Sequence, residues 1–211
     1  MNLSVKGVTV PSIYNLKPAF QNLMRPVMFF LHDLKITPNG LTLSAVGGSI
    51  CVGFLMTLVS MDNVKILIFP VWLFIRMALN ALDGMMAREF KLQSRLGLIL
   101  NEIGDLVSDA ALFIPFLILC PSAEFPILFF ILGGIFTEFC GLLGPALKAH
   151  RHYEGPMGKS DRAFFTGLLI VIVFFYPATI HYWKIFFAIA AALTLVTCLN
   201  RLTAIWKEAN L

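Results

Sequence analysis

Residues 80–105 read NALDGMMAREFKLQSRLGLILNEIGD, and this stretch decides how the chain folds. Its polar and charged side chains recur at helical spacing inside a sequence that is otherwise strongly apolar. An ionisable side chain inside a bilayer costs several kcal/mol unless it is paired or solvated. The stretch therefore predicts a functional site within a membrane protein.

The polar positions of this stretch fall on two helical faces that can meet. At about 100° per residue, one face of the first helix holds Asn80, Asp83, Gly84 and Ala87, and one face of the next holds Gly97, Asn101 and Asp105. Because the connector at residues 88–96 is short, the two helices would be antiparallel neighbours, and the small glycines would let them approach closely. Two carboxylates and two amide oxygens would then lie at similar depth. Such oxygen ligands suit Mg²⁺ or Mn²⁺.

The composition indicates a membrane protein. The chain has 211 residues, of which 58% are hydrophobic and 13% charged, and its mean hydropathy is +0.83. It is too apolar for a soluble domain and long enough for about six bilayer-spanning helices of roughly 20 residues each. We predict an all-α integral membrane protein with six transmembrane helices, at about residues 41–61, 64–87, 97–120, 126–147, 164–182 and 184–206.

An amphipathic segment precedes these spans. Phe20, Leu23, Val27 and Leu31 recur near i, i+3, i+4 spacing, as in a helix that lies in the membrane interface. We therefore divide the chain into an N-terminal cytoplasmic and interfacial segment, residues 1–40, and a six-helix membrane domain, residues 41–211.

The positive charges predict the topology. With six spans, both termini and the second and fourth loops share one side, which carries most of the 16 Lys and Arg residues. The positive-inside rule then predicts both termini in the cytoplasm and a site that faces the cytoplasm. We expect a bacterial inner membrane as the location. The net charge of +4 is spread over loops without a basic run, so we expect membrane lipids as partners and no nucleic acid.

The spacing in residues 80–105 resembles the signature of the CDP-alcohol phosphatidyltransferase (CDP-alcohol phosphotransferase) family, Asp-x2-Asp-Gly-x2-Ala-Arg-x8-Gly-x3-Asp-x3-Asp. Two positions depart from it, because Asn80 and Asn101 stand where the family has its first and third aspartates. The resemblance covers nearly the whole chain, including a Pro-Asn-x2-Thr pattern before the first span. The matching residues are Asp83, Gly84, Ala87, Arg88, Gly97 and Asp105, with Pro38, Asn39 and Thr42.

The resemblance implies transfer of a phosphatidyl group from CDP-diacylglycerol to an alcohol, with release of CMP. It places one or two Mg²⁺ or Mn²⁺ ions at Asn80, Asp83, Asn101 and Asp105, and it makes Asp105 the catalytic general base. It assigns nucleotide and pyrophosphate contacts to Asn39, Thr42, Gly84, Ala87, Arg88, Ser94 and Gly97. It also implies a homodimer.

The acceptor is suggested by basic residues. In relatives whose acceptor carries a phosphate, such residues form an anion pocket, and Lys148, Lys159, Arg162 and Arg201 stand in such places here. The resemblance therefore favours a phosphorylated polyol, with glycerol 3-phosphate first and inositol phosphate or a free alcohol as alternatives. Contact with lipid headgroups is the competing interpretation of these charges.

The two asparagines leave three interpretations open. The protein is a working enzyme with weaker or fewer metals, or its site recruits Glu102 or Asp109, or it is an inactive relative that binds CDP-lipid or regulates a partner lipid enzyme. We favour an active enzyme, because the rest of the motif is intact. A small transporter is a weaker alternative, because it would leave the Gly and Arg spacing unexplained.

Charged and aromatic residues outside the motif give further expectations. Arg76 and Asp109 each lie one turn deeper than the motif, so we expect them to form a buried ion pair, with Glu138 as a competing partner for Arg76. Trp183 and Trp206 lie near predicted span ends, as interfacial anchors do.

Overall fold

The computed structural model describes residues 17–60, 63–153 and 155–210. Residues 1–16 of the predicted N-terminal segment lie outside the described residues. The described part of the chain is helical, without strands. Its α-helices are α1 (Lys17–Asp33), α2 (Pro38–Leu58), α3 (Ile68–Glu89), α4 (Arg95–Phe113), α5 (Pro115–Leu119), α6 (Glu124–Ala146), α7 (Lys159–Phe175) and α8 (Trp183–Ala209), with short 3₁₀ turns η2 (Val64–Leu67), η3 (Pro121–Ala123) and η4 (Pro177–Tyr182).

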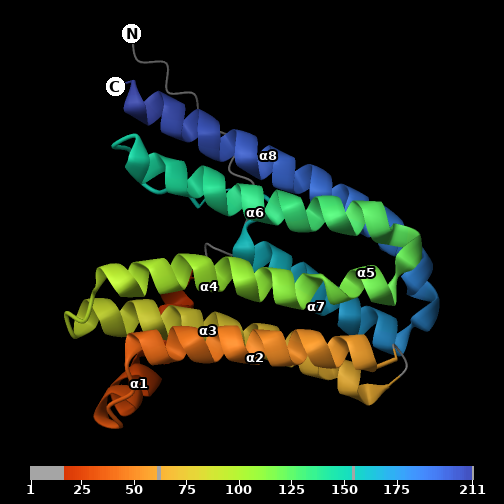
Figure 1. Cartoon of the computed structure of the whole chain (residues 1–211), viewed down its shortest axis with the longest axis horizontal. Helices are drawn as coiled ribbons and strands as arrows, with labels where there is room; N and C mark the ends of the chain where they lie inside the picture. Colours follow the sequence, from red (N-terminus) through yellow and green to blue (C-terminus); the bar gives the residue numbers. More distant parts are fainter. Residues whose placement is uncertain (1–16, 61–62, 154, 211) are drawn as a thin grey trace.

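The long helices pack in two groups. Figure 1 shows α2, α3 and α4 side by side, and α6 alongside α8, with α5 leading from one group to the other. Helix α7 packs against α3, and its Arg162 donates a hydrogen bond to Thr137 of α6, so that α7 connects the two groups. Helices α3 and α4 run antiparallel, but each packs mainly on α2. The predicted close approach of α3 to α4 at the glycines was wrong, because a Cβ at Gly84 would meet Arg88 of its own helix and one at Gly97 would meet Asn39 of α2.

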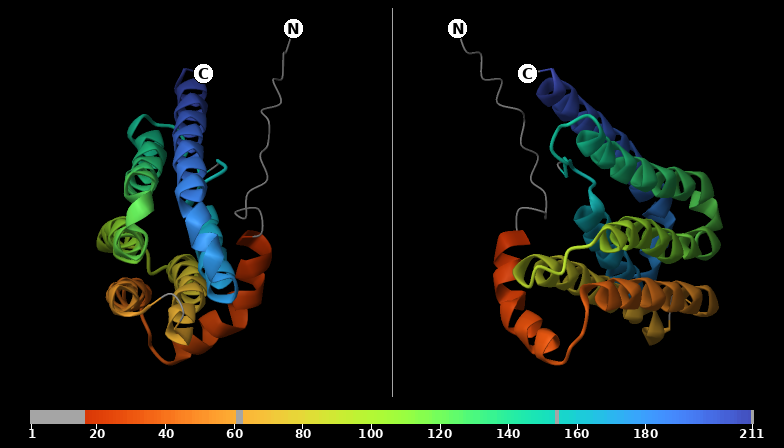
Figure 2. Two further views of the ribbon diagram at one scale, coloured as in Figure 1. Left: turned by 90° about the vertical axis from the view of Figure 1, so that its right-hand side faces the viewer. Right: turned by 60° about the vertical axis from the view of Figure 1, so that its left-hand side comes forward.

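Helix α1 forms within the predicted amphipathic segment, and its place in the membrane interface stays a prediction. It contacts α3 and lies outside the bundle, near the end where α3 joins α4 (Figure 2). Met28 is buried in a cluster with Leu82 and Met86, whereas Leu23 and Val27 are exposed. One apolar face therefore packs on the bundle and the other is available to lipid.

Four helices in the described residues are long and apolar enough to cross a membrane, at Pro38–Leu58, Val64–Glu89, Pro121–Ala146 and Pro177–Ala209. The other two predicted spans differ from their expected form. The third is divided at Ile114 between α4 and α5, and α7 has 17 residues, which is about 25 Å at 1.5 Å per residue. Six spans therefore remain a prediction.

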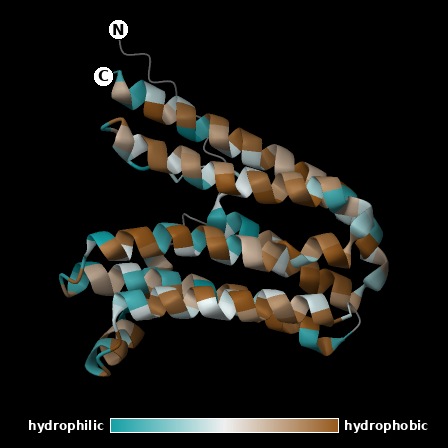
Figure 3. Cartoon of the chain, in the orientation of Figure 1, coloured by the Kyte–Doolittle hydropathy of each residue, from teal (hydrophilic) through white to brown (hydrophobic). Residues whose placement is uncertain are grey.

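The apolar core lies away from the polar motif. Figure 3 shows apolar residues along most of the helix length and hydrophilic residues gathered where α3 joins α4. Aromatic rings fill this core, with Phe116 in contact with Phe69, Trp183 and Phe187. The prediction of Trp183 as an interfacial anchor was wrong, because η4 turns the chain so that this side chain is fully buried. Trp206 is 73% exposed, as an anchor requires.

Candidate functional site

A cavity of about 810 Å³ opens between α2, α3, α4 and the start of α7. All four predicted metal-site residues line it, and so do all seven predicted nucleotide-site residues. Two of the four predicted acceptor residues, Lys159 and Arg201, also lie on its wall. The spacing of the motif thus corresponds to one surface in three dimensions.

Helix starts bring several of these residues to the cavity. Ser94 caps α4, because its Oγ accepts a hydrogen bond from the Gly97 N–H at 2.9 Å. Thr37 caps α2 in the same way, with its Oγ1 3.1 Å from the Gly40 nitrogen, so that Asn39 lies in the first turn. A Cβ at Gly97 would lie 2.9 Å from Asn39 Oδ1 and 3.0 Å from Ser94 Oγ. A larger residue at this position would therefore displace the Asn39 side chain.

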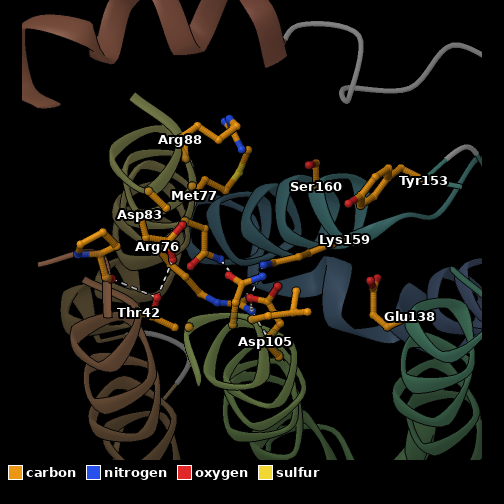
Figure 4. Close-up of a pocket in the computed structure, with 18 of the residues that line it drawn as sticks. Thr42, Arg76, Met77, Asp83, Arg88, Asp105, Glu138, Tyr153, Lys159 and Ser160 are labelled. Atoms are coloured by element: carbon orange, nitrogen blue, oxygen red, sulfur yellow. Dashed lines mark hydrogen bonds and ion pairs between the residues drawn. The ribbon is translucent and has the colours of Figure 1, made fainter. Parts of the chain in front are cut away.

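The two motif carboxylates have different surroundings. Asp83 accepts a hydrogen bond on Oδ2 from the Thr42 hydroxyl at 2.7 Å and is 5% exposed. Asp105 forms an ion pair with Lys159 and accepts a hydrogen bond on Oδ1 from Asn80 Nδ2 at 3.1 Å. Figure 4 shows Lys159 and Asp105 pointing toward one another, and Thr42 beside Asp83.

A buried ion-pair network lies beneath the cavity. Arg76 Nη1 lies 2.6 Å from Asp109 Oδ1, which confirms the predicted pair. Arg162 Nη2 lies 2.7 Å from Asp109 Oδ2 and 3.3 Å from Glu138 Oε1. Glu138 is therefore a partner of Arg162. Because Asp109 is occupied by two arginines, it is poorly placed to serve as a recruited metal ligand.

The structure separates the predicted acceptor residues. Arg162 is 1% exposed and lies below the cavity, where it supports the wall. Lys148, just after α6, is exposed and does not line the cavity. Its position suits contact with solvent or lipid headgroups.

A second group of charges forms the opposite wall. Arg151 pairs with Glu102 and lies 3.6 Å from Glu138 Oε2, while Arg201 Nη2 donates to the Tyr153 carbonyl at 3.1 Å. Burial acts to lower the pKa of Arg151, yet the hydrogen bond to Glu102 raises it above its usual value. Because the Glu102 carboxylate already pairs with Arg151, we do not expect Glu102 to ligate a metal ion.

Tyr153 and Ser160 line the cavity although the sequence analysis did not single them out. Burial raises the pKa of the Tyr153 hydroxyl, and the Arg151 guanidinium lies 5.0 Å from the centre of its ring. The available sequence signal was that Tyr153 lies near Arg151 and that Ser160 lies next to Lys159.

The donor set suits a hard cation. Asp83 and Asp105 supply carboxylates, and Asn80 and Asn101 supply amide oxygens, on one cavity wall. Such oxygen donors fit Mg²⁺ or Mn²⁺. Within the described residues, no group of three or more His, Cys, Asp or Glu side chains could hold a metal, so amide or substrate oxygens would have to complete the coordination.

The fold and the cavity define a helical membrane protein with carboxylate, amide and basic side chains on the wall of one cavity. The CDP-alcohol phosphatidyltransferase family model matches residues 35–197. The chain belongs to this family, and it is an integral membrane transferase of phosphate-containing groups in phospholipid biosynthesis.

One curated relative and two solved structures are similar to this chain. The chain is 46% identical over 190 residues to "Inner membrane protein YnbA" of Escherichia coli (strain K12), covering 90% of this chain and 94% of the relative. The fold is similar to that of Mycobacterium tuberculosis phosphatidylinositol phosphate synthase (PgsA1) with CDP-DAG bound, with a TM-score of 0.72, 19% identity, and coverage of 89% and 95% of the two chains. The same enzyme in complex with manganese and citrate gives a TM-score of 0.70 at 19% identity, with coverage of 87% and 88%.

Proposed function

We propose that this protein transfers a phosphatidyl group from CDP-diacylglycerol to the hydroxyl of a phosphorylated small alcohol and releases CMP. The observation that carries the proposal is the gathering of every motif position on the wall of one cavity. The CDP-DAG bound to the similar PgsA1 structure supports the choice of donor.

The reaction exchanges one P–O bond for another. The acceptor oxygen bonds to the phosphatidyl phosphorus, the bond from that phosphorus to CMP breaks, and Asp105 takes the hydroxyl proton. A divalent cation, held by Asp83, Asp105 and the amide oxygens of Asn80 and Asn101, would offset the charge of the pyrophosphate. Asn80 and Lys159 hold the Asp105 carboxylate in place.

The nucleotide side of the cavity orients the donor. Thr42 bonds to Asp83 and so fixes α2 against α3. Arg88 lies on the same wall near Gly84, where an added Cβ would come 3.3 Å from Arg88 Nη1. A guanidinium is suited to bidentate binding of phosphate oxygens, so Arg88 would bind the pyrophosphate.

The acceptor side favours an anion. Arg201 and Arg151 line the cavity near Lys159, and glycerol 3-phosphate is the first candidate acceptor. Arg162 lies beneath the pocket, where it forms ion pairs with Glu138 and Asp109. Lys148 does not line the pocket, and it is no longer proposed as an acceptor residue. The proposed setting is a homodimer in a bacterial inner membrane, with both termini and the site on the cytoplasmic side.

The direct test is CMP release. Purified protein in detergent should release CMP from CDP-diacylglycerol with Mn²⁺ or Mg²⁺ and glycerol 3-phosphate, and EDTA should abolish the release. Inositol phosphate and free alcohols form the comparison panel. Release with one of these acceptors alone would replace the acceptor assignment, and no release with any acceptor would indicate a CDP-lipid-binding protein.

Gly97→Ala should raise the KM for CDP-diacylglycerol about tenfold, a loss comparable to one hydrogen bond. The added methyl group would displace Asn39, whose Oδ1 would lie 2.9 Å from it. Steady-state kinetics of CMP release would measure the change. The matched control is Gly47→Ala, because a Cβ there meets nothing within 4 Å. Equal KM values for the two variants would contradict the role of this contact.

A further inference from the structure

We infer that the ammonium group of Lys159 takes the place of a second metal ion at Asp105, so that the site binds a single divalent cation. The inference rests on the proposed function. It assigns to Lys159 a role in charge balance at the reacting phosphates, in place of a contact to the acceptor's phosphate.

The motif lacks two of the negative charges that would balance a second metal ion. Asn80 and Asn101 are neutral where the family pattern has carboxylates. Asn80 also directs its amide nitrogen at Asp105 Oδ1, at 3.1 Å. Its contact with the carboxylate is thus that of a hydrogen-bond donor, whereas an aspartate there would repel Asp105 unless a cation lay between them.

Asp105 is surrounded by positive groups. Lys159 forms an ion pair with its Oδ1, and Arg76 Nη2 lies 3.7 Å from the same oxygen. Arg76 also donates to the Asp105 backbone carbonyl at 3.2 Å. A second divalent cation at this carboxylate, besides the one shared with Asp83, would have to approach two cations already paired with it, which is electrostatically unfavourable.

Asp83 offers a different environment. The hydrogen bond that its side chain accepts comes from the neutral hydroxyl of Thr42, at 2.7 Å. A neutral donor leaves the negative charge of the carboxylate available to an incoming cation. The asymmetry of the two carboxylates therefore places the divalent ion toward Asp83 and the ammonium ion at Asp105.

The fold fixes Lys159 at this place. It is the first residue of α7, directly after Gly158, whose N–H donates to Asp161 Oδ2 at 3.1 Å. One turn later, Arg162 is anchored to Asp109 at 2.7 Å. The lysine side chain is 26% exposed and reaches the cavity from this rigid start. An ammonium group supplies a compact positive charge that can neutralise phosphoryl oxygens.

The test counts Mn²⁺ ions and measures their affinity by electron paramagnetic resonance on purified protein in detergent. The wild type should bind one Mn²⁺ per chain in the site. Lys159→Met should bind Mn²⁺ about tenfold more tightly, because a neighbouring positive charge is removed, while Lys159→Arg should keep the wild-type affinity. Lys65→Met is the matched control, because Lys65 is exposed and lies outside the cavity wall.

A second variant tests the stoichiometry in the other direction. The triple variant that combines Asn80→Asp, Asn101→Asp and Lys159→Met should bind two Mn²⁺ ions per chain. Two ions in the wild type, none in the wild type, or an unchanged Mn²⁺ affinity in Lys159→Met would each overturn the inference. One bound ion without CMP release would refute the proposed function alone, and CMP release with two bound ions would refute this inference alone.

Discussion

Asp105→Asn is expected to lower the rate of CMP release by about a thousandfold, within the range that a general base contributes. The amide cannot accept the proton of the acceptor hydroxyl. It also leaves Lys159 and Arg76 facing a neutral group in place of the carboxylate that they contact in the wild type. The rate should be measured with enzyme in excess over CDP-diacylglycerol, so that the chemical step is observed.

Two controls accompany this variant. Asp33→Asn makes the same chemical change at an exposed site at the end of α1, outside the cavity wall, and should keep the wild-type rate. Equal thermal midpoints for wild type and Asp105→Asn would exclude unfolding as the cause of the loss. A rate within threefold of the wild type would show that Asp105 is not the base.

Arg162→Met is expected to destabilise the folded protein by about 3–5 kcal/mol, the cost of breaking a buried ion pair from one side. Arg162 is 1% exposed and bonds to Asp109 at 2.7 Å. It also reaches Glu138 at 3.3 Å and the Thr137 hydroxyl at 2.9 Å. Its removal leaves two buried carboxylates with less positive charge around them.

The matched control for this prediction is Arg25→Met. Arg25 lies 4.0 Å from Glu89, and its side chain is 54% exposed, so the loss should be about 1 kcal/mol or less. Denaturant-induced unfolding in detergent, followed by tryptophan fluorescence, would compare the two variants. Similar losses for both would contradict the assignment of Arg162 as the centre of the buried network.

Much of the fold could be predicted because apolar length and helix period are local properties. The segments around α2, α3, α6 and α8 follow directly from runs of apolar residues. The start of α7 could not be found this way, because Lys159 and Asp161 are polar and hydropathy placed the helix start at residue 164. Its true start depends on the Gly158–Asp161 hydrogen bond and on Arg162 reaching Asp109, which is 53 positions earlier in the chain.

The site was predictable in part for the same reason. The helix period predicts that Asn80 and Asp83 share one helix face and that Asn101 and Asp105 share another. The short connector predicts that these two faces lie at similar depth. The pair of Arg76 and Asp109 followed from equal depth on antiparallel helices.

The basic residues were harder to place. Lys148 and Lys159 look alike in the sequence as loop charges, yet only Lys159 lines the cavity. Its contact with Asp105 joins residues 54 positions apart, and it depends on how α7 packs between the two helix groups. The same holds for Arg151, which meets Glu102 only through tertiary structure.

The most direct test of the account is a calorimetric titration of CDP-diacylglycerol into the purified protein with Mn²⁺ and with EDTA. We expect binding of about one CDP-diacylglycerol per chain with Mn²⁺, and we expect EDTA or Asp83→Asn to abolish it. Absence of Mn²⁺ uptake together with absence of Mn²⁺-dependent CDP-diacylglycerol binding would contradict the account.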